Sequence, residues 1–288
     1  MTVHGQAPLW KGRGMTLLED SPWNYPGRAT TVPGLLTRDG FRTFAGIDTD
    51  DVARTRLSQG GPFGGRTLAD VLAEQRRTPV TGRFPLVLVG ADADPDRLRE
   101  KLVAAGREPV VPMLLGVLDG CASAFVAGVH PLGYVPEAVR RAPGERLGVV
   151  VALLSRGQLA AVVATKVRVT VRDATGMLTV HGAPWQDRRG AARLYDTDAG
   201  VLARDGVPVG FGAQSDALAA WPVEVRELVS RETGLGLHQV TVPRSVMPRL
   251  AADPALRFQV RVLLRDLGAS VPSGLDDLRP TVGLPVSS

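Results

Sequence analysis

The pattern of apolar and polar positions predicts strands and helices in mixed order along the chain. A continuous apolar run, FPLVLVG at 84–90, is typical of a buried strand. The following segment, 94–106, has amphipathic helical spacing, with Asp94 suited to cap its start and Gly106 suited to end it. Over 166–182, valine alternates with polar residues around the sequence DATG, and this period of two predicts a β-hairpin.

Shorter signals predict further elements on both sides of this block. Apolar runs broken by turn residues favour strands, whereas helical spacing behind a capping residue favours helices. The expected elements are a hairpin at 35–44 that turns at Asp39-Gly40, a helix at 67–77 capped by Thr67, strands at 108–120 and 122–130, a strand or buried segment at 147–155, a helix that begins within 155–166, and helices within 215–234 and 247–268.

The order of these elements predicts the fold class and a division of the chain. Strands and helices are interspersed without regular βαβ alternation, which favours an α+β protein with a mixed, barrel-like sheet, flanking helices and a helical C-terminal region. Residues 1–80 are rich in Gly, Pro and Arg and are expected to form an N-terminal extension that packs on the core. The core is expected to span 81–270, and 271–288 is expected to be a mobile tail.

The loop that follows the strand at 84–90 is the first candidate for a binding site. Its sequence, VGADADP, places a glycine and short polar residues between a strand end and a helix start. Backbone N–H groups in such a connection can form a concave nest that holds a carboxylate or an oxyanion. The loop contains no Ser, Cys, His or Lys, so it offers binding groups and no nucleophile.

Composition removes several classes of function. The net charge is +5, but Lys occurs only at Lys11, Lys101 and Lys166, and the other 31 of the 34 basic residues are arginine. These arginines are spread along the chain without interleaved aromatic residues, so nucleic-acid binding is not predicted. A single cysteine, Cys121, excludes an intrachain disulfide and a cysteine-based zinc site, and its apolar surroundings favour a small core residue.

Other motifs for metals, cofactors and membranes are also missing. The four histidines are far apart and lack the spacing of a metal site, and no P-loop, GxSxG or GxGxxG motif occurs. The N-terminal sequence MTVHGQAPLWKGRG has no apolar region of a signal peptide, and no apolar run approaches the ~20 residues that span a bilayer. We therefore expect a cytoplasmic protein with no metal, no cofactor and no membrane contact.

The segment 85–166 resembles the γ-glutamylcyclotransferase-like proteins. Their hallmark is a strand that ends in a Tyr-Gly-Ser-Asn or Tyr-Gly-Ser-Leu loop, and PLVLVGADADP lies over this pattern without a gap. Val89 falls where the family has Tyr, Gly90 matches, Ala91 replaces Ser and Asp92 replaces Asn.

Two later stretches and one earlier stretch extend the resemblance to about a third of the chain. The sequence AFVAGVHPLGYVPEAVRRAPG at 124–144 is similar to a family segment with a His, a Gly-Tyr element and a Pro-Gly turn, and it contains His130 and Tyr134. LSRGQLAAVVATK at 154–166 resembles the Leu-x-x-x-Gln-Leu segment that leads to the family's catalytic Glu. WNYPGR at 23–28 also resembles longer relatives.

The resemblance implies a chemistry that this chain departs from. In the family, loop amides hold a γ-glutamyl group, a carboxylate takes a proton from the α-amine, and the amine attacks the γ-carbonyl to close 5-oxoproline. The position that matches the catalytic Glu is Lys166, and a protonated lysine would repel the substrate ammonium. The nearest alternative carboxylates are Glu145 and Glu137.

Three functions therefore remain open, and no catalytic residue is assigned. The first is a protein that has lost the general base and binds a small carboxylate-bearing metabolite or a partner. The second is an active enzyme on γ-glutamyl or related amides with a relocated base, and the third is an interaction protein whose pocket is filled with side chains. A cavity of ~300 Å³ or more beside the loop separates the first two from the third. The residues expected to bind a ligand are Val89, Gly90, Ala91, Asp92, His130, Tyr134 and Lys166.

Overall fold

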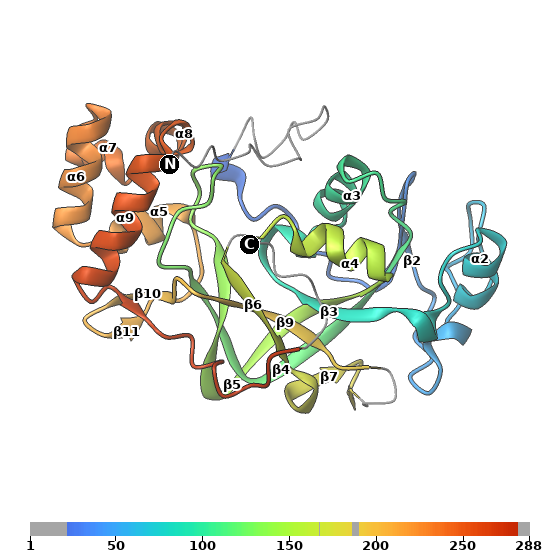
Figure 1. The fold of residues 1–288 in the computed structure, drawn as a ribbon. Coiled ribbons are helices and arrows are strands. Elements are labelled where there is room, and N and C mark those ends of the chain that lie inside the picture. The colour runs from blue at the N-terminus through green and yellow to red at the C-terminus, as the bar shows by residue number, and fades with distance from the viewer. Residues whose placement is uncertain (1–21, 167, 186–189, 282–288) are drawn as a thin grey trace, which may run out of the picture.

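A computed structural model of the chain describes residues 22–166, 168–185 and 190–281, and it has the expected α+β class (Figure 1). A nine-stranded mixed sheet has the order β2-β1-β4-β5-β3-β9-β6, with β7 and β8 attached to β4. In the described part of the chain β2 and β6 remain the ends of this order, so no closed barrel is seen. The strands are β1 (Gly34–Thr37), β2 (Gly40–Thr43), β3 (Phe84–Leu88), β4 (Val111–Phe125), β5 (Glu137–Leu154), β6 (Val169–Asp173), β7 (Leu178–Val180), β8 (Ala183–Pro184) and β9 (Arg193–Thr197).

The longest strand pair, β4 with β5, forms the centre of the sheet. The antiparallel register is interrupted once, where Asp119 opposes Arg146 but Cys121 opposes Arg141. The extra residues on β5 include a Pro-Gly pair at 143–144, and they bulge without ending either strand. The two strands expected at 108–120 and 122–130 are therefore one strand, because a bulge accommodates extra residues within a continuing ladder.

The position of β3 agrees with the strand expected at 84–90. It pairs antiparallel with β5 and parallel with β9, and Leu86, Val87 and Leu88 are each at most 1% exposed. The apolar run is continuous because both faces of this central strand are covered.

The prediction of a β-hairpin at 166–182 is wrong. β6 pairs with β9, whereas β7 pairs with β4 and β8. The Asp173 carboxylate accepts hydrogen bonds from the Thr175 amide at 3.0 Å and from its hydroxyl at 2.5 Å. These bonds lead into the 3₁₀ turn η5 (Thr175–Met177), after which the chain continues to a different strand. The alternating pattern identified two strands correctly, but it could not show that their partners lie elsewhere.

Two helices cover the part of the sheet that carries the candidate loop. α3 (Pro95–Ala104) begins at its cap Asp94, and α4 (Arg156–Val163) begins with a capping box between Ser155 and Gln158. Their apolar faces share one buried cluster with β3 and β5. The shorter α2 (Leu68–Glu74), capped by Thr67, lies apart from these two helices, beyond β2 at the right of Figure 1.

The C-terminal region is helical, as expected, and has its own core. Trp221, Phe125 and Tyr25 belong to this second buried cluster, so it includes residues from the sheet and from the N-terminal segment. A small sheet of order β11-β10-β12 lies between the helices and β4. The elements of this C-terminal region are α5 (Gln214–Ala220), α6 (Val223–Thr233), α7 (Leu237–Val240), α8 (Pro243–Ala252), α9 (Pro254–Asp266), β10 (Val201–Arg204), β11 (Val207–Pro208) and β12 (Ser270–Val271).

The two ends of the described chain are tied to the sheet. In the N-terminal region, β1 pairs with β4, so residues before 81 supply two strands of the central sheet. The tail expected to be mobile is packed over 271–281: Leu275 is fully buried, and the Thr281 amide donates to the Val171 carbonyl at 2.9 Å. Residues 282–288 of that tail and residues 1–21 lie outside the described part.

Candidate functional site

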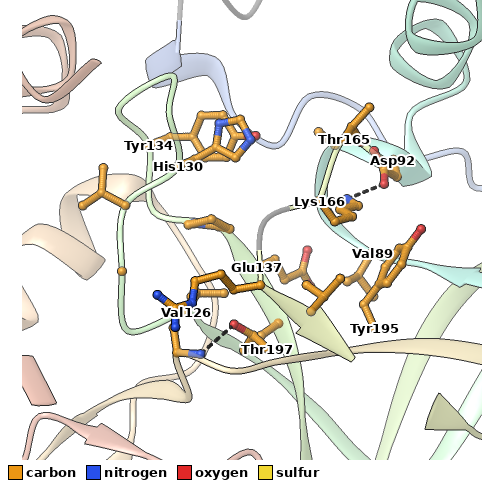
Figure 2. A pocket seen from close by; sticks show the side chains of 18 of the residues that line it. Val89, Asp92, Val126, His130, Tyr134, Glu137, Thr165, Lys166, Tyr195 and Thr197 are labelled. Atoms are coloured by element: carbon orange, nitrogen blue, oxygen red, sulfur yellow. Dashed lines mark hydrogen bonds and ion pairs between the residues drawn. The ribbon is translucent and has the colours of Figure 1, made fainter. Parts of the chain in front are cut away.

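A cavity of about 350 Å³ lies beside the end of β3. Its walls come from β3 and the turn η4 (Gly90–Ala93), the β4–β5 connection at 126–136, the end of α4, β9 and α9. Figure 2 shows His130 and Tyr134 on one side of this space and Lys166 with Asp92 on another. The volume lies within the usual range for small-molecule sites, so the pocket is not filled with side chains.

The shape of the loop depends on glycine at position 90. Gly90 has a φ of +61°, and a Cβ atom there would lie 2.2 Å from the Tyr25 hydroxyl oxygen. A side chain at this position would therefore be strained by its backbone and would collide with Tyr25. The neighbouring Val89 and Ala91 line the cavity.

The first amide of the expected nest already has a partner. The Gly90 N–H donates to the Glu137 carboxylate at 2.7 Å, and the Glu137 N–H in turn donates to the Tyr25 hydroxyl at 2.9 Å. Burial raises the pKa of Glu137 to about 7, although the hydrogen bond from Gly90 opposes this shift. Glu137 lines the cavity, so the site contains a carboxyl group that titrates near neutral pH.

Asp92 has a different environment two residues further along the loop. Its side chain is 1% exposed and forms ion pairs with both Lys101 and Lys166, the latter at 2.5 Å. Burial alone would raise the pKa of Asp92, but the two ammonium groups outweigh it and hold the pKa well below the usual range. Asp92 is therefore ionised at neutral pH.

Lys166 lies between this carboxylate and an aromatic ring. Its Nζ atom is 5.1 Å from the centre of the Tyr195 ring, a distance at which a cation–π contact forms. Burial lowers the pKa of Lys166, Lys101 lowers it further, and Asp92 acts in the opposite direction. Tyr195 also lines the cavity, and its buried hydroxyl has no hydrogen-bond partner among the described residues.

Three stacked rings form the opposite side of the cavity. Tyr25 stacks on Tyr134 at a centroid distance of 4.0 Å, and Tyr134 stacks on His130 at 4.3 Å. The Leu132 amide donates to His130 Nδ1 at 3.2 Å, so the neutral ring carries its hydrogen on Nε2. Burial, aided by the nearby Lys101, lowers the pKa of His130 well below its usual value. His130 is therefore a neutral hydrogen-bond donor at the cavity.

The structure brings together the residues that the sequence singled out. Val89, Ala91, Asp92, His130, Tyr134 and Lys166 all line the cavity, while Gly90 shapes the loop and donates to Glu137. Of the two alternative carboxylates, Glu137 lies in the cavity wall, whereas Glu145 sits in the exposed bulge of β5 and pairs with Arg140. A role in ligand binding remains a prediction for each of these residues.

The sequence did not identify three contributors. Tyr25 comes from the weakly patterned N-terminal region, and Tyr195 comes from β9, which is not among the predicted strands. Lys101 had a usable signal, because it is one of only three lysines and follows the candidate loop within the next helix.

Comparisons with known proteins found no matching family model, no matching curated protein and no matching solved structure. Within the described residues, no group of three or more His, Cys, Asp or Glu side chains is placed to bind a metal ion. Cys121 is fully buried in the core of the sheet, and burial raises the pKa of its thiol. No helix in the described ranges is long and apolar enough to cross a membrane.

Proposed function

We propose that this chain is a γ-glutamylcyclotransferase-like protein that has lost the family's general base and binds a small carboxylate-bearing metabolite. The observation that carries the proposal is the excess of positive charge at the cavity. The cavity is lined by two carboxyl groups, Asp92 and Glu137, and by five basic side chains, so positive charge remains in excess even when one lysine is neutral. The basic residues are Lys101, Lys166, Arg168, Arg257 and Arg261. An anionic ligand would supply the missing negative charge.

Other groups in the cavity suit the same ligand class. The neutral His130 offers an N–H donor, and the buried Tyr195 hydroxyl lacks a partner in the described chain. A ligand oxygen that accepts from either group would satisfy a donor that now has no protein acceptor. Valines from β3 and β5, with Leu194 from β9, supply apolar surface for a short hydrocarbon chain.

Ligand-dependent unfolding tests this function. Small mono- and dicarboxylates should raise the unfolding temperature, whereas amines and neutral amides of the same size should leave it unchanged. A ligand at about 100 times its dissociation constant stabilises the fold by about 2.7 kcal/mol. Lys166→Met should weaken the affinity for the carboxylate ligand at least about tenfold. Arg146→Met, which removes an exposed cation paired with Asp119, should leave that affinity unchanged. Stabilisation by amines, or by none of the probes, would refute the proposal.

A second candidate is an active enzyme, and the position of Glu137 favours it. A carboxyl group with a pKa of about 7, held by the Gly90 amide in the cavity wall, has the properties of a general base at neutral pH. In this mechanism Glu137 would take a proton from the α-ammonium of a γ-glutamyl compound, and the freed amine would attack the γ-carbonyl. The γ-amide C–N bond would then break, and Glu137 would return the proton to the departing amine.

Release of 5-oxoproline from a panel of γ-glutamyl amines, detected by mass spectrometry, tests this candidate. Glu137→Gln should abolish turnover while the control Glu145→Gln retains it. If the wild type is silent but Lys166→Glu is active, the loss of the base at position 166 is the cause, and the binding function gains support.

A further inference from the structure

The charges around Asp92 do not balance. The side chains of Lys101 and Lys166 are 16% and 24% exposed, and each contacts a different oxygen of the same buried carboxylate. Two ammonium groups this close repel each other, and partial burial denies them the water that would screen the repulsion. The arrangement makes the release of one proton easier than from an isolated lysine, and that release converts one of the two ammonium groups into a neutral amine.

Lys166 is the lysine better placed to supply that amine to a bound molecule. Burial and the neighbouring Lys101 both favour its uncharged form, and its side chain lies against the ring of Tyr195. A neutral lysine amine is a nucleophile, whereas an ammonium is not. Figure 2 shows this side chain at the cavity, where a bound molecule can reach it.

The choice of lysine at both positions points to amine chemistry. Arginine supplies almost all of the positive charge in this chain, and it could pair with Asp92 as well as lysine does. Arginine cannot lose its proton in a protein, and its guanidinium does not attack carbonyl groups. Both lysines of the described chain nevertheless converge on one carboxylate at one cavity.

We propose that Lys166 forms an imine with a small 2-oxo carboxylate. The Nζ lone pair attacks the ketone carbon, the carbonyl oxygen takes up a proton to give a carbinolamine, and loss of one water leaves the C=N bond. The reaction needs no oxidant or reductant. When protonated, the imine is a cation, and it keeps the ion pair with Asp92 that the ammonium formed.

The pair of lysines also defines the ligand class. In a 2-oxo acid the carbonyl carbon is bonded directly to the carboxylate carbon, so the electrophile and the negative charge are adjacent. Lys166 and Lys101, held next to each other by Asp92, match this arrangement, with Lys101 as the cation for the carboxylate. The inference rests on the proposed binding function and adds a covalent step and a substrate class to it.

Reductive trapping tests the imine. The full chain is incubated with pyruvate or 2-oxoglutarate and sodium cyanoborohydride, and the intact mass and peptide map are recorded. Each trapped ligand should add its acid mass less one oxygen atom, at Lys166. Because the sequence has only three lysines, mapping is unambiguous. Lys166 should react at least about tenfold faster than Lys11 or Lys101, because burial lowers the pKa of Lys166 and the cavity holds the ligand beside it.

Matched controls separate the imine from simple binding. Lys166→Arg keeps the positive charge beside Asp92 and should abolish labelling, whereas Lys11→Arg makes the same chemical change elsewhere and should not. Acetone, which has a methyl group in place of the carboxylate of pyruvate, should label Lys166 at least about tenfold more slowly than pyruvate. Lactate, which lacks the carbonyl, should raise the unfolding temperature without labelling.

The outcomes distinguish the two proposals. Equal labelling of the three lysines, or labelling that survives in Lys166→Arg, overturns the imine. If lactate and pyruvate stabilise the fold equally and no label appears, the imine is overturned and the binding function stands. If neither stabilisation nor label appears, both proposals fail.

Discussion

Asp92 and Glu137 are both buried carboxyl groups beside the same loop, but their environments differ. Asp92 is matched by two ammonium groups, and its pKa is lowered far below the usual range. Glu137 has only backbone and hydroxyl partners, and burial raises its pKa to about 7. Burial acts on both groups in the same direction, so the nearby cations decide the outcome.

This difference assigns separate roles to the two groups. An acid that stays ionised can hold the lysines in place but cannot exchange protons near neutral pH. An acid with a pKa of about 7 can take up or release a proton under ordinary conditions. Pairs of titratable groups with such divergent environments are typical of functional sites.

The largest expected effect follows from removing the negative charge at Asp92. Asp92→Asn leaves two partly buried ammonium groups without a counter-charge, and the free energy of unfolding should fall by about 3 kcal/mol in urea titrations at pH 7. The stabilising contribution of a carboxyl group with a lowered pKa is present above its unfolded pKa and is lost as the pH falls. Wild type should therefore lose this advantage over the variant below about pH 4.

The control is Asp119→Asn, which removes the same charge from an exposed pair with Arg146. It should change the free energy of unfolding by less than about 1 kcal/mol. Equal effects of the two substitutions would mean that the lysines at Asp92 are not held by its charge.

A smaller effect of opposite pH dependence is expected at Glu137. Because its pKa is raised from 4.5 to about 7, the folded chain binds more protons than the unfolded chain between these values, and stability falls as the pH rises through this window. Glu137→Gln keeps an acceptor for the Gly90 amide and removes the titration. The variant should be more stable than wild type at pH 8, by about 3 kcal/mol at most, and nearly equal to it at pH 4.

Urea unfolding at several pH values between 4 and 8 measures this difference. The matched variant Glu145→Gln changes an exposed carboxylate of the β5 bulge. Its free energy of unfolding should depend on pH as that of the wild type does. If the free energy of unfolding of Glu137→Gln depends on pH as that of the wild type does, Glu137 does not titrate near neutral pH, and the contrast with Asp92 disappears.

The smallest effect concerns the tyrosine that contacts both Gly90 and Glu137. Tyr25→Phe deletes the hydroxyl that accepts from the Glu137 amide, and the unpaired N–H should reduce the free energy of unfolding by about 1–2 kcal/mol. Tyr134→Phe removes a hydroxyl from the adjacent stacked ring without affecting that amide and serves as the control. If Tyr134→Phe costs as much as Tyr25→Phe, the hydrogen bond to Glu137 is not what stabilises the loop.

The sequence predicted local structure best where the residues that stabilise an element lie within the same short segment. The helix caps at Thr67 and Asp94 are correct because a capping side chain bonds to an amide two or three residues later. The buried strand at 84–90 was evident from its apolar run. The hairpin at 166–182 failed because strand pairing is a long-range property, and β6 and β7 each have a better partner elsewhere.

The same limit applies to the candidate site. Gly90 and Asp92 could be selected because loop and helix signals flank them, and Lys166 could be selected by its resemblance to a catalytic position. The pairing of Asp92 with Lys166 was not foreseeable, since 74 residues separate them in the printed sequence. Tyr25 could not be selected, because its contact with Glu137 spans 112 residues and leaves no periodic trace in either segment.

The long β4–β5 pair has a consequence for the order in which the cavity is assembled. These strands are neighbours in sequence, and the connection between them, together with the first residue of β5, supplies His130, Tyr134 and Glu137. On the opposite wall, Tyr195 reaches its place only when β9 pairs with β3, where Leu86 lies opposite Arg193. Closing the larger loop costs more chain entropy, so contacts of low sequence separation form ahead of those of high separation. The β4–β5 connection, with His130, Tyr134 and Glu137, is thus the scaffold onto which Tyr195 of β9 is later fitted. Mutations in the β4–β5 pair should slow folding, whereas mutations in β9 should mainly accelerate unfolding.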